Sequence, residues 1–224
     1  MKTGQSIATS QRGFTLVEIA IVLVIIGLLL GGVLKGQELI NSAKVKNFAT
    51  DFRNIPLFIY GYQDRHRAVP GDDTNVTTHI VGTTEATTPG TTGNGVIEGN
   101  WNSTTQTDES YLFWQHVRMA QLVSGSTTAG AAGYIPTNAD GGTIGIESNN
   151  TTPYITGLLG AYVVCSDAIQ GRYAVQLDTS LDDGNTATGS MRAVPTGSAR
   201  GTAGTATATV VAAPGSSYTV CMSV

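Results

Sequence analysis

The chain has 224 residues, a formal net charge of −4, and only 12% charged residues. This length allows one domain with a hydrophobic core together with an extended element. The 12 lysines and arginines are spread along the chain and form no basic patch, which argues against a nucleic-acid partner. Two cysteines are too few for a disulfide-rich scaffold or a cysteine zinc centre. The abundance of glycine and threonine is typical of an exported, β-rich protein rather than a cytosolic enzyme.

An apolar segment of membrane length follows a short polar start. Residues 1–13 are polar and hold Lys2 and Arg12 with no acidic residue, and residues 14–34 read FTLVEIAIVLVIIGLLLGGVL. As a helix, this segment would span about 31 Å, which is the thickness of a bilayer core. The two positive residues ahead of it predict a cytoplasmic N-terminus, with the chain after Lys35 on the other side of the membrane.

Glu18 is the one charged residue of the apolar segment. A charged side chain near the centre of a membrane helix costs about 2.5–3.5 kcal/mol on insertion scales, so Glu18 calls for a partner or a function. A secretory signal peptide is disfavoured, because no small-residue cleavage site follows the apolar run. A simple signal anchor, with Glu18 reaching toward the membrane interface, stays open as an alternative.

The sequence GFTLVE at residues 13–18, followed by the apolar run, resembles the type IV prepilin signature. That family includes type IV pilins, competence pilins and the pseudopilins of type II secretion. The resemblance implies that residues 1–13 are a leader peptide, which a prepilin peptidase removes after Gly13, and that Phe14 is then N-methylated. It also implies that Glu18 pairs with the Phe14 amine of a neighbouring subunit during assembly. Electrostatics agrees, because a buried carboxylate requires a cation.

The same resemblance implies a single-pass precursor in the inner membrane. Its partners would be other pilin subunits, the prepilin peptidase and a pilus or secretion assembly platform. Three functions stay open: a type IV pilus subunit, a pseudopilin of a periplasmic type II secretion filament, and a minor tip pilin for adhesion or DNA uptake. The length of the region 67–224 and the presence of two cysteines favour a pilus.

The helix is expected to continue beyond the membrane, over residues 14–66 in all. Its second half carries an apolar stripe with spacings of three and four residues: Val45, Phe48, Phe52, Ile55, Ile59 and Tyr62. This pattern predicts a helix that packs its stripe on a globular domain. Pro56 lies inside this helix and is expected to kink it. Residues 14–34 would form the transmembrane span and later the filament core.

Residues 67–224 are expected to form an extracytoplasmic globular head. Residues 74–107 are rich in threonine, glycine and asparagine, which predicts a loop. A helix is predicted over residues 109–123, with Thr107 or Asp108 as its N-cap.

Strands are predicted late in the chain, after a second loop over residues 125–150. The apolar, β-branched and aromatic segments 159–165, 172–177, 207–212 and 217–222 each read as a strand. The predicted fold class is therefore α+β and type IV pilin-like. A long N-terminal helix would pack its C-terminal half on a small antiparallel sheet of about four strands, joined by Gly/Thr-rich loops.

Cys165 and Cys221 fall in the first and the last predicted strand, on the exported side of the membrane. Because disulfides persist in oxidising compartments, we expect a bond between them. Closing a loop of about 55 residues would contribute about 4 kcal/mol in the chain-entropy model. The resemblance points the same way, since pilins often tie their C-terminal region with a disulfide. Two buried free thiols are the alternative.

Asp178, Asp182 and Asp183 bring three carboxyl groups within six residues, beside Gly184. Calcium prefers clusters of oxygen ligands on a turn, so a structural calcium ion is one hypothesis. The spacing does not match an EF-hand loop. A solvated acidic turn without any metal is the alternative, and no other cofactor is expected.

Other candidates carry weaker patterns. Asp72 and Asp73, near Asn75, could hold a metal, and residues 94–98 resemble the latter part of a calcium loop that lacks its leading acidic residues. The histidines are scattered, and His116 is expected to be a core residue. No nucleophile elbow, phosphate-binding loop or C-x-x-C motif occurs, so we expect a protein that is not an enzyme.

Overall fold

A computed structural model of the protein describes residues 15–149 and 152–224. The predicted leader, residues 1–13, and the predicted new N-terminus, Phe14, lie outside the described residues. Cleavage after residue 13 and methylation of Phe14 therefore stay predictions here.

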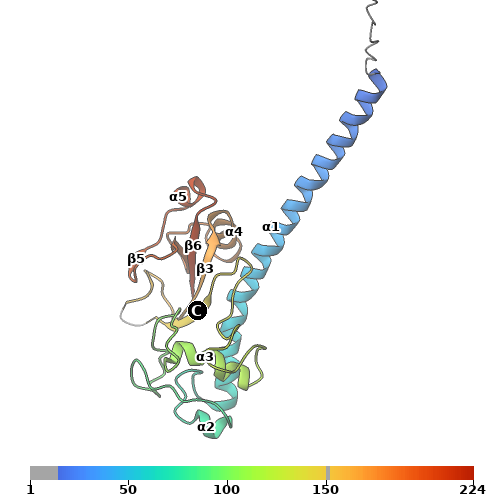
Figure 1. Ribbon diagram of the computed structural model, residues 1–224. Coiled ribbons are helices and arrows are strands. Elements are labelled where there is room, and N and C mark those ends of the chain that lie inside the picture. Colours follow the sequence, from blue (N-terminus) through green and yellow to red (C-terminus); the bar gives the residue numbers. More distant parts are fainter. Residues whose placement is uncertain (1–14, 150–151) are drawn as a thin grey trace, which may run out of the picture. The chain divides into compact units, whose positions relative to one another are not determined.

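Helix α1 (Leu16–His66) passes through two compact units, Met1–Ser42 and Ala43–Val224. The described part of the smaller unit is Thr15 and the first half of α1, and all its residues from Leu16 to Leu34 are exposed. The helix is long and apolar enough to cross a membrane by length and composition. The predicted long N-terminal helix is confirmed (Figure 1).

In the larger unit, the second half of α1 packs its apolar stripe into the core. The buried residues of α1 are Phe48, Ala49, Phe52, Ile55, Ile59 and Tyr62. Five of the six predicted stripe residues are among them, and the sixth, Val45, is partly buried against the same core. The helix continues through Pro56 without ending there.

The larger unit contains a four-stranded antiparallel sheet. Its strands are β1 (Ile144–Ser148), β3 (Tyr162–Gln170), β6 (Ser217–Ser223) and β4 (Met191–Pro195). They lie in the order β1-β3-β6-β4, so the two longest strands, β3 and β6, are central and pair with each other. Figure 1 shows β3 and β6 side by side in this unit. The predicted α+β layout with a small antiparallel sheet is confirmed.

Smaller elements surround this sheet. Strands β2 (Ile155–Thr156) and β5 (Thr202–Ala203) form a two-stranded parallel ladder. Helix α2 (Val76–His79) is a single turn inside the predicted loop, and α3 (Glu109–Met119) carries many of the buried residues of the unit.

Two predicted strands are helices in the structure. The prediction for residues 172–177 is wrong, since they lie in α4 (Gly171–Leu181), and the prediction for residues 207–212 is wrong, since they form α5 (Thr207–Ala212). The buried residues of α4 recur with helical spacing and are Gly171, Tyr173, Ala174, Leu177 and Asp178. The β propensity of tyrosine, valine and threonine is a weak preference, which packing along one helical face overrides.

Two strands of the four-stranded sheet occur where none is predicted. Strand β1 lies in the predicted loop 125–150, and β4 follows the acidic turn after α4. The sequence of β1 does not read as a strand, because Gly145 interrupts its apolar pattern. A Cβ atom on Gly145 would lie 1.7 Å from the backbone oxygen of Trp101, so only glycine allows the two segments to approach this closely.

Helix α3 begins as predicted and ends earlier than predicted. Asp108 takes the N-cap position, but its side chain makes no capping hydrogen bond and instead accepts from Ser103 Oγ at 2.6 Å and Thr88 Oγ1 at 2.7 Å. The helix stops because Gln121 adopts a left-handed backbone conformation with φ 61°, and Leu122 N–H then bonds to Val117 O.

Candidate functional site

Glu18 is held by its own helix turn. The backbone N–H and the hydroxyl of Thr15 both donate to Glu18 Oε2 at 2.8 Å. Within residues 15–149 and 152–224, Glu18 has no ion-pair partner. A charge of this kind, on a helix of membrane length, is partnered when another molecule supplies a cation. The predicted cation, the Phe14 amine, lies outside the described residues.

The helix around Glu18 presents a continuous apolar surface. Its large aliphatic side chains between Leu16 and Leu34 have exposed fractions between 46% and 90%. Soluble proteins rarely leave so much contiguous apolar surface in water, so a surface of this size marks a membrane or protein interaction site. The segment is therefore built to lie in lipid or among other helices.

The two cysteines form a disulfide that joins the central strands of the sheet. Cys165 on β3 and Cys221 on β6 are directly opposite in the antiparallel register, and their sulfur atoms are 2.05 Å apart. Both are fully buried in a second hydrophobic cluster that includes Trp101 and Tyr154. The expected Cys165–Cys221 bond is present in the structure.

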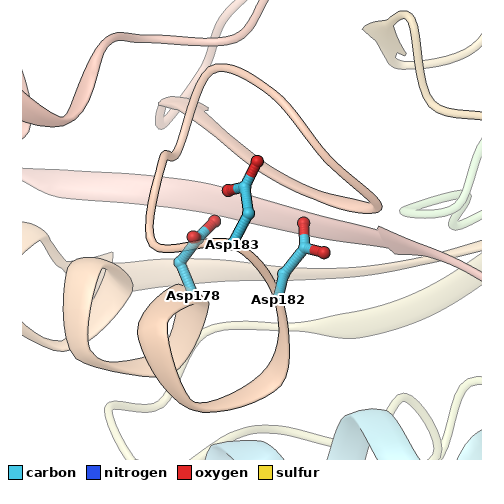
Figure 2. Close-up of side chains that lie close together, drawn as sticks. All are labelled: Asp178, Asp182 and Asp183. Carbon is cyan, nitrogen blue, oxygen red and sulfur yellow. The ribbon is translucent and has the colours of Figure 1, made fainter.

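The three acidic residues of the turn after α4 lie together. One oxygen from each of Asp178, Asp182 and Asp183 can be chosen so that all three lie within 4.8 Å of one another. Figure 2 shows the three carboxyl groups at the C-terminal end of α4, directed toward the loop that follows it. The predicted residues are thus brought together, and their geometry is compatible with a shared cation.

These three carboxyl groups differ in burial. Asp178 is buried, Asp182 is half-buried and Asp183 is exposed. Burial and the negative charges of Asp183 and Asp182 raise the pKa of Asp178 to about 6, which the amides of Gly184 and Asn185 offset only in part. Hydrogen bonds from the Asn185 amide and the Thr188 hydroxyl hold the pKa of Asp183 below its usual range.

The weaker metal candidates around Asp72 and Asp73 are satisfied by the protein itself. Asp72 accepts backbone N–H groups from the glycine loop 93–95, among them Gly95 N at 2.6 Å. Asp73 accepts from the Tyr62 hydroxyl at 2.7 Å and from Asn75 N at 2.9 Å. Within the described residues, neither joins a three-residue group of metal-binding geometry.

Tertiary structure also makes a histidine cluster that the sequence did not reveal. The rings of His66 and His79 stack with centroids 5.3 Å apart, and His79 Nδ1 lies 2.6 Å from Asp73 Oδ2. They line an open pocket of about 360 Å³ with Arg67. Burial and the neighbouring His79 lower the pKa of His66. Only the spacing of 13 residues links the two histidines in sequence, which gives no recognisable motif.

His116 is a core residue, as expected. It is fully buried, its Nδ1 accepts Gly71 N–H at 2.9 Å, and its Nε2 lies 2.8 Å from the Thr84 carbonyl. A ring that accepts at one nitrogen and donates at the other is neutral. Burial lowers the pKa of His116 to about 4, in agreement with that tautomer. His116 therefore ties loops to α3 and offers no free nitrogen to a metal.

The fold and the exposed helix together define a class of protein: an α+β head behind an N-terminal apolar helix of membrane length. Residues 9–34 match the family model of the prokaryotic N-terminal methylation motif. This motif is the signature of type IV prepilin-like proteins, and the chain carries it together with a pilin-like layout. Comparison with curated proteins and with solved structures gave no match.

The motif supports a precursor of the pilin or pseudopilin type. It implies a structural protein and suggests assembly with other pilin subunits and their machinery. The apolar helix behind the motif suggests a membrane-anchored precursor.

Proposed function

We propose that this chain is the precursor of a structural subunit of an extracellular type IV pilus-like filament. A prepilin peptidase removes residues 1–13, Phe14 is N-methylated, and subunits leave the inner membrane to assemble through residues 14–34. The observation that carries this proposal is the methylation motif at residues 9–34, at the start of a helix whose large aliphatic side chains from Leu16 to Leu34 are exposed. The function is structural and involves no catalysis.

On assembly, the apolar helix leaves its contacts with lipid and gains contacts with the helices of neighbouring subunits. Fully exposing one leucine, isoleucine or valine to water costs about 1.5–3 kcal/mol, so the apolar helix cannot pass through water unprotected. Transfer from lipid to a bundle of similar helices is nearly balanced in hydrophobic energy, since lipid tails are as apolar as leucine. The hydrophobic surface therefore supplies adhesion without specificity, and polar groups must select the register.

Glu18 supplies that register. Its carboxylate is costly in an apolar environment, and Thr15 compensates it only with hydrogen bonds. The free amine that cleavage would create at Phe14 of an adjacent subunit is a cation of the required kind. A subunit placed one step too high or too low would leave both charges unpaired, which disfavours wrong registers.

The head is suited to an oxidising exterior. Its central strands are joined by the buried Cys165–Cys221 disulfide, and such bonds persist outside the cytoplasm. Its loops are rich in glycine and threonine and poor in charge. These features support display of residues 67–224 beyond the inner membrane.

The decisive experiment replaces Glu18 in the native host and measures assembly. Glu18→Ala should still be inserted in the membrane fraction, but should disappear from filaments sheared from the cell surface. Glu38→Ala is the matched control: it removes another carboxylate of the same helix, whose partner Lys35 is exposed and three residues away. Exposed pairs of this kind contribute about 0–1 kcal/mol, so this variant should assemble normally.

Other outcomes would distinguish the remaining functions. Normal amounts of Glu18→Ala in sheared filaments would contradict the role of Glu18. Wild-type protein confined to the periplasm would favour a pseudopilin, and wild-type protein at trace levels in filaments built of another subunit would favour a tip pilin.

A further inference from the structure

We propose that His66 and His79 bind one zinc ion at the open pocket beside the end of α1. This inference is independent of the proposed filament function, because it concerns the head of the single chain. It rests on three observations: the position of the two imidazole rings, the carboxylate that orients one of them, and the charge of the pocket that both line. Imidazole nitrogen is a preferred ligand of zinc.

The two imidazole rings have nitrogens that a metal ion can reach. His79 Nδ1 lies 2.6 Å from Asp73 Oδ2. In the part of the chain that the structure describes, His79 Nε2 and both ring nitrogens of His66 make no hydrogen bond. His66 is half-buried, His79 is exposed, and both line the same open pocket of about 360 Å³. The third histidine, His116, uses both its ring nitrogens inside the core and offers none.

The separation of the two rings fits a tetrahedral metal ion. With zinc–nitrogen distances of about 2.0–2.1 Å, the centroids of two imidazole rings on one tetrahedral ion lie about 5.2 Å apart. Two adjacent rings on a square-planar ion lie closer, at about 4.5 Å. The centroids of His66 and His79 are 5.3 Å apart, and their planes are inclined by 30°. A ring can turn about its metal–nitrogen bond, so this inclination is compatible with one shared ion. The separation therefore favours zinc over copper(II).

Asp73 holds the His79 ring in the orientation of a metal ligand. Metal-binding histidines almost always donate their second ring N–H to a carboxylate, a carbonyl group or water, which fixes the ring and its tautomer. The Asp73 carboxylate lies at Nδ1 and so leaves Nε2, on the other side of the ring, for a metal. Its side chain is 1% exposed and also accepts from the Tyr62 hydroxyl at 2.7 Å and from Asn75 N–H at 2.9 Å. The carboxylate that such a histidine requires is thus already held in place.

His66 is positioned by α1. It is the last residue of this helix, and the ring of Tyr62, one turn earlier, packs against it with centroids 4.5 Å apart. The C-terminus of a helix carries a partial negative charge, which stabilises a cation placed there. The end of α1 therefore supplies both a ligand and a favourable electrostatic potential.

The charge of the pocket also favours a cation. Its lining contains two carboxylates, Asp72 and Asp73, and one guanidinium, that of Arg67. With both histidines neutral, the carboxylates outnumber the guanidinium, so the lining is negative. Arg67 opposes a bound cation and limits the affinity. Two histidines fill two of the four positions of a tetrahedral zinc ion, so the site should be weaker than a structural zinc centre with four protein ligands.

The test measures zinc binding to the full chain, without a histidine tag, in detergent at about pH 7.5, where free imidazole is neutral. Equilibrium dialysis against ⁶⁵Zn²⁺ should give one ion per wild-type chain. The expected dissociation constant is about 10⁻⁶–10⁻⁴ M, because the chain supplies half the ligands of a structural site. Absence of binding to the wild type at about 1 mM zinc would overturn the proposal, and this measurement needs no variant.

Three variants and a control locate the ion. His66→Gln and His79→Gln should each weaken zinc binding by about tenfold or more, because glutamine keeps a polar side chain and lacks the imidazole nitrogen. Arg67→Gln should strengthen binding by about two- to fivefold, since it removes a repulsive charge from the pocket. Asp183→Asn, in the acidic turn after α4, is the control and should bind zinc like the wild type.

Circular dichroism checks that each variant is folded, and the Arg67 variant stays informative if a histidine variant is not. Wild-type affinity in both histidine variants would overturn the proposal. So would unchanged affinity in Arg67→Gln, or loss of binding in Asp183→Asn, because either result would place the ion outside this pocket.

Discussion

The guanidinium of Arg200 pairs with the buried carboxylate of Glu147 across 53 residues of sequence. Arg200 Nη1 lies 2.9 Å from Glu147 Oε1, and Arg200 Nη2 contacts Glu147 Oε2. The Glu147 side chain is 1% exposed, while that of Arg200 is 33% exposed. Trp101 N–H also donates to Glu147 Oε2 at 2.8 Å. This pair anchors the loop after β4 to the edge strand β1.

Breaking this pair from one side should destabilise the head strongly. Arg200→Met should lower the free energy of unfolding by about 3 kcal/mol, because it leaves the Glu147 charge buried without a cation. The double variant Glu147→Gln/Arg200→Met should recover a large part of the loss, since glutamine is neutral and still accepts from Trp101 N–H. Urea unfolding of the two variants measures the difference, and equal stabilities would contradict a buried charge at Glu147.

The disulfide should stabilise the head mainly by reducing the conformational entropy of the unfolded chain. Replacing both Cys165 and Cys221 by alanine should lower the free energy of unfolding by about 4 kcal/mol, since the bond closes a loop with a sequence separation of 56. Mass spectrometry without reduction should show the two peptides linked. Two cysteines that react with an alkylating reagent in the native exported protein would rule the bond out.

Glu109 should make the stability of the head depend on pH. It is fully buried, and burial together with the charges of Asp72 and Glu98 raises its pKa from 4.5 to about 8, although the Glu98 amide opposes this. A raised folded-state pKa means that the folded state binds the proton more tightly. The resulting stability is fully present below about pH 4.5 and is lost as the pH rises through about 8. The loss amounts to a few kcal/mol, because one pKa unit corresponds to about 1.4 kcal/mol.

Chemical unfolding of the full chain between pH 5 and 9 tests this dependence. Glu109→Gln should flatten the decline, because it keeps an acceptor for the Glu98 amide and cannot ionise. Glu85→Gln, which alters an exposed acid, should follow the wild-type curve. Parallel curves for wild type and Glu109→Gln would show that Glu109 does not titrate in this range.

Cleavage of the leader is expected to depend on Gly13. Replacing Gly13 by tryptophan should leave uncut precursor, because the bulky side chain would block the peptidase at the bond before Phe14. Mass spectrometry of the membrane-extracted protein would detect the extra 13 residues and the absence of N-methylation. Gly4→Trp, within the polar leader and away from the cut, is the control and should be processed. Normal mature protein from the Gly13 variant would end the prepilin interpretation.

For α3, the sequence pattern predicts the start of the helix correctly and its end incorrectly. The apolar spacing places the helix start at Glu109 correctly, because that spacing reports a face that must be buried. It places the end four residues too late. The left-handed backbone of Gln121, together with the Leu122 N–H bond to the Val117 carbonyl, decides the end, and the sequence alone offers no glycine there as a marker.

From the sequence alone we predict the long helix with its apolar segment and its buried stripe, a bond between the two cysteines, and the acidic turn. These features depend on periodicity, length and close spacing in the chain, which can be read from the sequence without knowledge of the fold. Three features depend instead on contacts between distant parts of the chain: the helix over residues 172–177, the strands β1 and β4 of the sheet, and the Arg200–Glu147 pair. Short segments have weak intrinsic preferences, so the free energy of packing against distant residues decides their conformation.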